Sequence, residues 1–216
     1  MSKLFFSFFA LAAISGILMA QNSQSIQFNA GAVFPMNSSK GFSTTLQYNY
    51  SLSQSVQLYA WSGISWWGEN HVIHEMDWSE IQTNQFITSY DADEHVLIPL
   101  YLGSRFNVHS DKLFTTFLNL ELGYSHLSYN AYDNVKVVDE NTGRVVEFYA
   151  DPKTKRKVNE NLFGIGAGLG LSREIAQGVE LMLFYKLNSF INSNYGGFFT
   201  SRGTYNTVSL GINYGI

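Results

Sequence analysis

The sequence contains no cysteine, and only 3 of its 216 residues are proline. The absence of cysteine excludes a disulfide framework, a thiolate metal site and a lipid-modified N-terminal cysteine. Charged residues make up 14% of the chain, against roughly 25% in an average soluble domain, so part of the surface is expected to face something other than water. The formal net charge of −4 argues against a nucleic-acid partner.

Long hydrophobic runs are absent after residue 20. Before it, Lys3 is followed by the apolar stretch LFFSFFALAAISGILMA and then by the polar QNSQS. This order predicts a secretory signal peptide over residues 1–20 and a single domain over 21–216. The alternative is an N-terminal membrane anchor, although the run is short for a spanning helix of ~20 apolar residues. The exported chain is expected to cross a membrane by strands.

What the sequence does contain is a period-two alternation of apolar and polar residues. It runs through eight segments: 25–34, 41–50, 56–67, 96–106, 115–126, 162–172, 179–188 and 208–216. Their length fits the ~9–11 residues of a tilted membrane strand. In the third segment two alternating sets are apolar, one with Leu58 and Ile64 and the other with Tyr59 and Trp61. We assign the apolar face to the set with Leu58 and Ile64.

Charge is confined to one face of these segments. The charged residues inside them all fall opposite the apolar face: Arg105, Glu121, Glu180 and Lys186. A lipid-facing Arg or Lys costs ~2–4 kcal/mol at mid-depth, so an uncharged face suits a wall against lipid. The alternation alone leaves open which face is inside.

The connections favour a membrane barrel. Those after the second, fourth and sixth segments are short, whereas those after the third, fifth and seventh are much longer. We therefore predict an all-β fold, an eight-stranded antiparallel up-and-down transmembrane β-barrel with short periplasmic turns and long extracellular loops. Pro99 is expected near a rim or at a bulge, because a closed sheet uses every N–H group.

The chain ends on a strand pattern, SLGINYGI, that resembles the C-terminal assembly signal of bacterial outer-membrane barrels. Its positions are Ser209, Gly211, Tyr214 and Ile216, with Ile where Phe is usual. With IPLYLGSRF and FGIGAGLGLS, the chain is similar to the small eight-stranded outer-membrane β-barrels (the OmpX-like and OmpA transmembrane-like group). The resemblance implies a monomer in a Gram-negative outer membrane. Its implied partners are outer-membrane lipid and lipopolysaccharide, and the insertion machinery through the last strand.

Polar residues on the inward face predict a hydrogen-bonded network inside the barrel, because a buried lone charge is costly. Its expected members are Tyr101, Arg105, Asn119, Glu121 and Lys186. The network is either a plug that fills the lumen or the gate of a narrow, porin-like pore. Glycines at every second position from Gly164 to Gly170 are expected to leave room for large inward side chains on neighbouring strands.

The long connections hold weaker signals. A divalent cation could bind His71, His74, Glu75 and Asp77, although solvated loops often carry such residues, and no cofactor is predicted. The third loop predicts a hairpin around DENTGR. Its KTKRK run, residues 153–157, could contact anionic lipopolysaccharide.

An enzymatic reading rests on His126 and Ser128, which share a strand face. They resemble the H-x-S-N motif of lipid A deacylases, with Tyr129 in place of the Asn and Glu160 as the nearest acid. The predicted function is a non-enzymatic outer-membrane barrel with a structural or surface-interaction role through its loops, or a narrow pore. The alternatives are a lipid A deacylase-like esterase and a secreted lipocalin-like ligand-binding barrel.

Overall fold

The computed structural model describes residues 24–75, 86–111, 113–192 and 203–216. The described residues form strands and one short 3₁₀ helix, η1 (Pro152–Thr154). No helix in this part of the chain is long and apolar enough to cross a membrane. The strands are β1 (Gln24–Pro35), β2 (Gly41–Ser51), β3 (Val56–Trp67), β4 (Asn70–Glu75), β5 (Phe86–Ser110), β6 (Thr115–Ala131), β7 (Asn134–Val138), β8 (Val145–Ala150), β9 (Arg156–Ala176), β10 (Val179–Phe190) and β11 (Thr204–Gly215).

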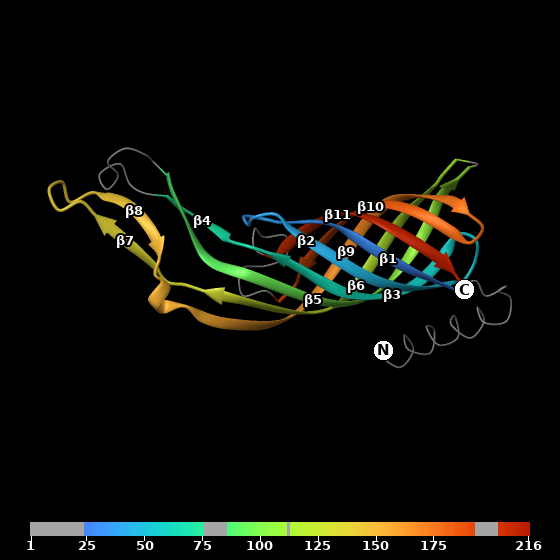
Figure 1. Ribbon diagram of the computed structural model, residues 1–216, viewed down its shortest axis with the longest axis horizontal. Coiled ribbons are helices and arrows are strands. Elements are labelled where there is room, and N and C mark those ends of the chain that lie inside the picture. The colour runs from blue at the N-terminus through green and yellow to red at the C-terminus, as the bar shows by residue number, and fades with distance from the viewer. Residues whose placement is uncertain (1–23, 76–85, 112, 193–202) are drawn as a thin grey trace, which may run out of the picture.

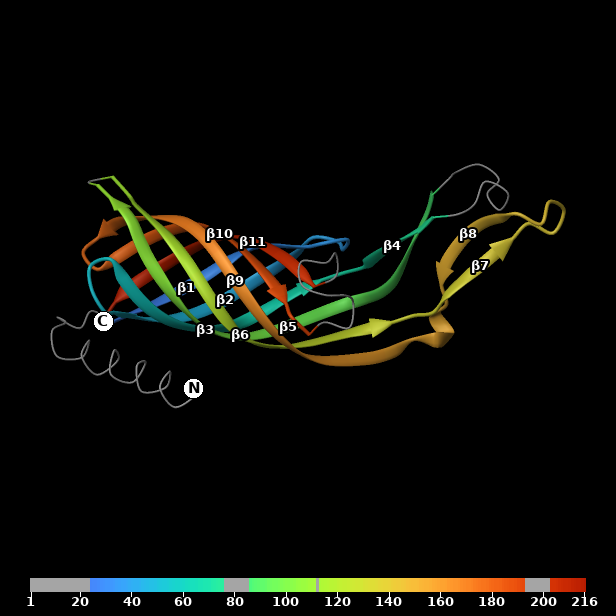
Figure 2. The same ribbon diagram turned by 180° about the vertical axis from the view of Figure 1, so that it is seen from behind.

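Eight of these strands close into a barrel. They pair in the order β3-β2-β1-β11-β10-β9-β6-β5, and β5 returns to pair with β3, always antiparallel. The first and last strands meet along their whole length, from Ser25 opposite Gly215 to Pro35 opposite Tyr205. Both chain ends of the barrel lie at the same rim as the short turns, which we call the turn end (Figures 1 and 2). The predicted fold class is confirmed.

The outer wall of the barrel is apolar and its interior is largely polar. On the wall, Leu120 is 57% exposed and Leu183 is 47% exposed, whereas Gln27 and Asn119 inside are at most 2% exposed. In β3 the predicted phase is correct, because Leu58 is exposed and Tyr59 is buried. A lipocalin-like barrel would need the apolar face inside, so that alternative is wrong.

Three strands continue far beyond the barrel. β5 has 25 residues, β6 has 17 and β9 has 21. The strands predicted over 96–106, 115–126 and 162–172 are therefore too short. Much of the two predicted long loops is therefore strand. We call β4, residues 86–95 of β5 and residues 127–161 the extension; it lies at the left of Figure 1. Beyond lipid both strand faces can be polar, so the apolar alternation that marks membrane strands is lost.

The tip of the extension contains the hairpin predicted around DENTGR. β7 and β8 pair from Asn134 opposite Ala150 to Val138 opposite Val145. The Asp139 carboxylate accepts from the backbone N–H groups of Asn141 and Thr142. Gly143 completes the turn at φ +68°, which L side chains rarely adopt.

Pro99 lies within the barrel wall and not at a rim. The β3–β5 pairing runs from Ser62 opposite Leu100 to Ser65 opposite Leu97, without paired residues between them. The Ser62 hydroxyl donates to the Pro99 carbonyl at 2.7 Å. The ladder therefore opens locally where proline has no N–H to donate.

Candidate functional site

The most highly connected group in the lumen is the carboxylate of Glu121. Its Oε2 accepts from the Tyr59 hydroxyl at 2.9 Å, from the Trp61 indole N–H at 2.9 Å and from the Lys186 ammonium at 2.8 Å. Its Oε1 accepts from the Asn188 amide at 2.8 Å. Four donors from β3 and β10 therefore surround one buried carboxylate on β6, as a buried charge requires.

Lys186 is enclosed by rings as well as by its counter-ion. Its Nζ lies 4.5 Å from the centre of the Trp61 ring, 5.5 Å from Tyr59 and 5.6 Å from Phe184. Ring faces attract a cation, most strongly where water is excluded, and Lys186 is only 6% exposed. The ammonium is thus held by one carboxylate and an aromatic cage.

Arg105 forms a second layer nearer the turn end. Its guanidinium donates to Gln27 Oε1 at 3.0 Å and to Asn119 Oδ1 at 3.3 Å, and lies 4.4 Å from the centre of the Phe117 ring. Within the described residues no carboxylate hydrogen-bonds the Arg105 guanidinium, so neutral amide oxygens and a ring face compensate its burial.

The structure thus brings the predicted interior residues together in two pairs, Arg105 with Asn119 and Glu121 with Lys186. Tyr101 joins them by packing: its ring stacks on Trp61 at 5.1 Å, and its hydroxyl has no hydrogen-bond partner within the described chain. Sequence reasoning missed Tyr59, Trp61, Asn188 and Gln27 as network members. Tyr59 and Trp61 could have been found, because the phase assigned to β3 already turned both inward.

Glycines of β9 allow these groups to meet. Lys186 and Glu121 lie on β10 and β6, with β9 between them. A Cβ at Gly166 would lie 2.8 Å from Glu121 Cγ, and one at Gly168 would lie 2.9 Å from Lys186 Cγ. Side chains at these two positions would occupy the space through which the ion pair forms.

An apolar layer fills the lumen toward the extension. Its buried members come from nearly every strand around the barrel and include Val33, Trp67, Leu97, Leu127, Leu162, Phe190 and Tyr205. An eight-stranded barrel is just wide enough for side chains to fill. The ionic network and this apolar layer therefore both occupy the lumen with buried side chains.

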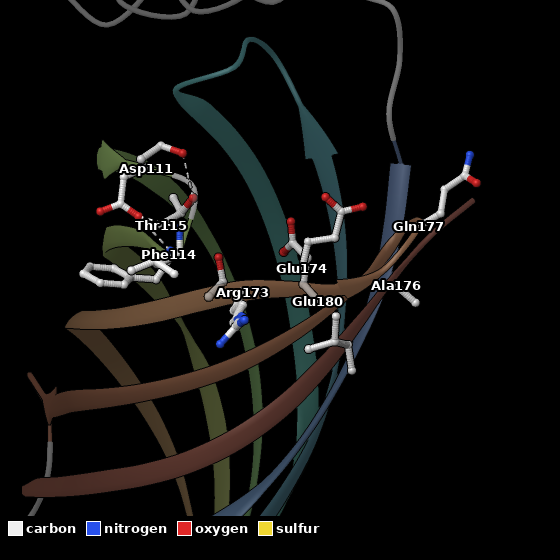
Figure 3. Close-up of a pocket in the computed structure, with 12 residues that line it drawn as sticks. Asp111, Phe114, Thr115, Arg173, Glu174, Ala176, Gln177 and Glu180 are labelled. Atoms are coloured by element: carbon white, nitrogen blue, oxygen red, sulfur yellow. Dashed lines mark hydrogen bonds between the residues drawn. The ribbon is translucent and has the colours of Figure 1, made fainter.

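A pocket of about 630 Å³ opens at the turn end (Figure 3). It lies between the β5–β6 turn and the end of β9, and its carboxylates are Asp111, Glu174 and Glu180. Each carboxylate is already used: Asp111 accepts from the Leu113 and Phe114 N–H groups, Glu174 from Gly178 N–H, and Glu180 from the Asn213 amide. The pocket therefore offers no carboxylate without a hydrogen-bond donor.

The residues considered for a metal do not converge. His71 and His74 are three residues apart on β4, so they lie on opposite strand faces. The His74 ring stacks on Phe148, with 3.9 Å between ring centres, and its Nε2 contacts Ser89 Oγ at 2.8 Å. Asp77 lies outside the described residues, and within them no group of three His, Asp or Glu side chains could hold an ion.

The residues considered for ester hydrolysis lie on two different faces of the sheet, with the acid opposite the His and the Ser. His126 and Ser128 lie on the outer face of β6, and His126 Nδ1 is 3.1 Å from Asn161 Oδ1. Glu160 is 8% exposed on the inner face, where its Oε1 accepts from the Tyr129 hydroxyl at 2.7 Å. The nearest predicted acid therefore cannot orient His126.

The basic run of residues 153–157 is partly neutralised within the extension. Lys155 Nζ lies 3.8 Å from Glu94, and Arg156 lies 2.7 Å from Asp133. A hydrogen bond that Lys155 donates to the Tyr132 hydroxyl, and the charge of Glu94, raise the pKa of the Lys155 ammonium. Half of the four cations in this run are thus paired.

The extension is packed as a folded unit. The His74–Phe148 stack joins β4 to β8, and Ser89 Oγ donates to Asn134 Oδ1 at 2.8 Å, which joins β5 to β7. Burial lowers the pKa of the His74 imidazole, although the charge of Asp91 opposes this.

At the C-terminal strand, Tyr214 and Ile216 are 57% and 61% exposed on the outside, whereas Ser209 is buried at 6%. Gly211 faces Asn29, because a Cβ there would collide with Asn29 Oδ1. These positions agree with an exposed apolar end of the strand, and their recognition by insertion machinery stays a prediction.

No protein-family model and no curated protein sequence matches the chain. Solved structures do match. Neisserial surface protein A is 14% identical, with 88% of this chain and 96% of that chain covered and a TM-score of 0.55. A major outer membrane protein from Thermus thermophilus is 12% identical, with 89% and 99% covered and a TM-score of 0.55. The chain therefore has the fold of the small eight-stranded outer-membrane β-barrels.

Proposed function

We propose that this protein is a sealed, non-enzymatic barrel of the bacterial outer membrane whose functional part is the extension, displayed outside the cell for contact with other surfaces. The observation that carries the proposal is that β5, β6 and β9 continue as paired strands past the barrel. Mobile loops would suffice to close a barrel. A paired, packed extension instead offers a fixed shape, which binding favours because less freedom is lost on contact.

The side chains that fill the lumen support this function over transport. The ionic network and the apolar layer both lie across the channel axis, and each is built from buried side chains. A narrow pore would have to disrupt both. We therefore expect no ion conductance when the protein is inserted in a planar lipid bilayer, and steady single-channel currents would contradict the sealed barrel.

The surface role is tested by removing the hairpin tip. Asp151 N–H donates to the Asp133 carbonyl at 2.9 Å, so replacing residues 134–150 by two glycines closes the chain with little displacement. A laboratory strain displaying the shortened protein should adhere less to polystyrene, collagen-coated and heparin-coated surfaces than one displaying the intact chain. The shortened barrel should still migrate faster before boiling than after it. Equal adhesion by both strains at equal surface levels would refute the role of the extension.

A further inference from the structure

We propose that the outer wall of β6 and β9, immediately beyond the apolar wall, binds the phosphorylated headgroup of a membrane lipid. The site is a patch of outward side chains that we call the polar ladder: His126, Ser128, Lys157, Asn159 and Asn161. It requires that the wall faces lipid, but it does not depend on the surface-contact role of the extension.

The register of β6 and β9 arranges the wall in rungs. Leu120 faces Ala167 and Leu122 faces Ile165, both aliphatic rungs. The next rung is aromatic, because Tyr124 faces Phe163 and their rings meet edge to face at 5.6 Å. Beyond it the outward residues change completely to polar ones.

The polar rungs continue the same face without a break. His126 faces Asn161 and Ser128 faces Asn159. Lys157 precedes Asn159 by two residues on β9 and so lies one rung farther from the barrel. None of these five side chains is buried. One strip of two neighbouring strands therefore passes from aliphatic to aromatic to polar within three rungs.

The spacing of the rungs places the polar ladder among lipid headgroups. Rungs are two residues apart, or about 7 Å along a strand, which at a tilt of about 45° is about 5 Å in height. An aromatic pair at the end of an apolar wall marks the membrane–water interface. The headgroup region is about 5–8 Å thick on each side of the hydrocarbon core, so the first polar rung lies within it. Lys157 lies two rungs farther out, and its long side chain must point back toward the membrane to reach a phosphate.

Internal hydrogen bonds fix the first polar rung. Asn161 Oδ1 accepts from the Tyr124 hydroxyl at 2.5 Å and lies 3.1 Å from His126 Nδ1. An amide oxygen only accepts, so His126 Nδ1 carries the hydrogen in this contact. The Asn192 amide donates to the Asn161 carbonyl at 3.0 Å. The rung is thus held in place before any lipid arrives.

The side chains of the polar ladder suit a phosphate that carries hydroxyl groups. The Lys157 ammonium offers charge-assisted hydrogen bonds to phosphate oxygens. The amides of Asn159 and Asn161 and the hydroxyl of Ser128 both donate and accept, as sugar or glycerol hydroxyls require. Carboxylates nearby already have donors. Glu160 accepts from Tyr129 on the inner strand face, Asp93 accepts from Asn130 and Tyr132, and Glu94 accepts from Asn130 and pairs with Lys155.

Continuity with the apolar wall favours a lipid over a soluble protein. A ligand that bonds the polar ladder and also covers Tyr124 and Phe163 must have a polar head and an apolar body. The acyl chains of a membrane lipid would lie on the aliphatic rungs below. Either the phosphorylated glycolipid of the outer leaflet or a glycerophospholipid offers this chemistry.

Native mass spectrometry of the purified protein in non-ionic detergent tests the site. The probes are diphosphoryl lipid A, phosphatidylglycerol and, as the phosphate-free lipid, diacylglycerol. We expect both phosphorylated lipids to be retained at concentrations at which diacylglycerol is not. Tighter retention of lipid A would identify the glycolipid as the source of the headgroup, and tighter retention of phosphatidylglycerol would identify the phospholipid. Equal retention of diacylglycerol would overturn the proposal.

Variants assign the retained lipid to the polar ladder. Lys157→Ala, an exposed position, should weaken retention of the phosphorylated lipids about tenfold, as expected for one lost charge-assisted hydrogen bond. His126→Ala with Asn159→Ala should weaken it further. The matched control is Asn206→Ala, because Tyr185 donates to Asn206 at 2.5 Å in the same Tyr–Asn arrangement on β10 and β11. Unchanged retention by heat-modifiable, folded Lys157→Ala protein, or equal loss in the control, would refute the assignment.

Discussion

Glu121 and Lys186 form a buried ion pair across the strand that separates them, with 2.8 Å between Oε2 and Nζ. The two side chains come from β6 and β10 and pass over β9 at Gly166 and Gly168. The ion pair therefore depends on the two glycines, which have no side chain in its path, as much as on the two charged residues. The stability of the barrel interior is expected to follow from this arrangement.

Removal of the carboxylate should cost more stability than removal of both charges. Glu121→Ala leaves Lys186 buried without its counter-ion and should destabilise the barrel by about 3–5 kcal/mol. Glu121→Gln combined with Lys186→Met should recover a large part of that loss, because no unpaired charge remains. Urea unfolding in lipid vesicles, followed by tryptophan fluorescence, measures both. A double variant less stable than Glu121→Ala would contradict this explanation.

Filling the glycine stripe should disrupt the same pair. Gly166→Val places a branched side chain where Glu121 Cγ and the Asn188 amide now lie, so overpacking of about 1–3 kcal/mol or more is expected. The neighbouring Ala167→Val is the control, because Ala167 faces outward and is exposed. The difference in unfolding free energy between the two variants is the measurement. Similar values for both would show that the glycine is not needed for packing.

A charge on the wall should be costly only within the membrane. Leu120→Arg puts a cation on the exposed apolar wall and should destabilise the protein in vesicles by about 2–4 kcal/mol. Thr88→Arg makes the same change on an exposed residue of the extension, where an effect within about 0.5 kcal/mol is expected. Equal effects would show that Leu120 does not face lipid.

Acid should loosen the extension through His74. Burial lowers the pKa of this imidazole below its ordinary value of 6.5, so the packed ring stays neutral where the freed ring takes a proton. The stabilising contribution of the His74–Phe148 stack is therefore present above about pH 6.5 and is lost as the pH falls through the folded-state pKa.

Nuclear magnetic resonance of labelled histidine in micelles measures this pKa directly. Phe148→Ala removes the ring that covers His74, so its pKa should return toward 6.5. Titration of His74 above the value in the Phe148→Ala variant would contradict burial as the cause.

The barrel could be predicted from the sequence because lipid imposes a strict rule on each strand. Leu118, Leu120 and Leu122 must be apolar, whereas Asn119 and Glu121 between them fill the lumen. This alternation can be recognised in the sequence. The extension could not be predicted in full, since the buried residues of 86–95 include polar ones such as Ser89 and His95, and an apolar alternation is therefore missing there. The contacts of Glu121 with Tyr59 and Asn188 also escaped prediction, because pairing across the lumen depends on register and curvature that no single strand encodes.

The central claim is that the apolar wall faces lipid around a closed interior, and the absence of cysteine allows a direct measurement. Single cysteines at Leu120 and Leu183 on the wall, Asn119 in the lumen and Thr88 on the extension would carry nitroxide spin labels in vesicles. Oxygen dissolved in lipid should relax the labels at Leu120 and Leu183, whereas a water-soluble nickel complex should relax only the label at Thr88. Relaxation of the wall labels by the nickel complex and not by oxygen would contradict this structure of the membrane wall.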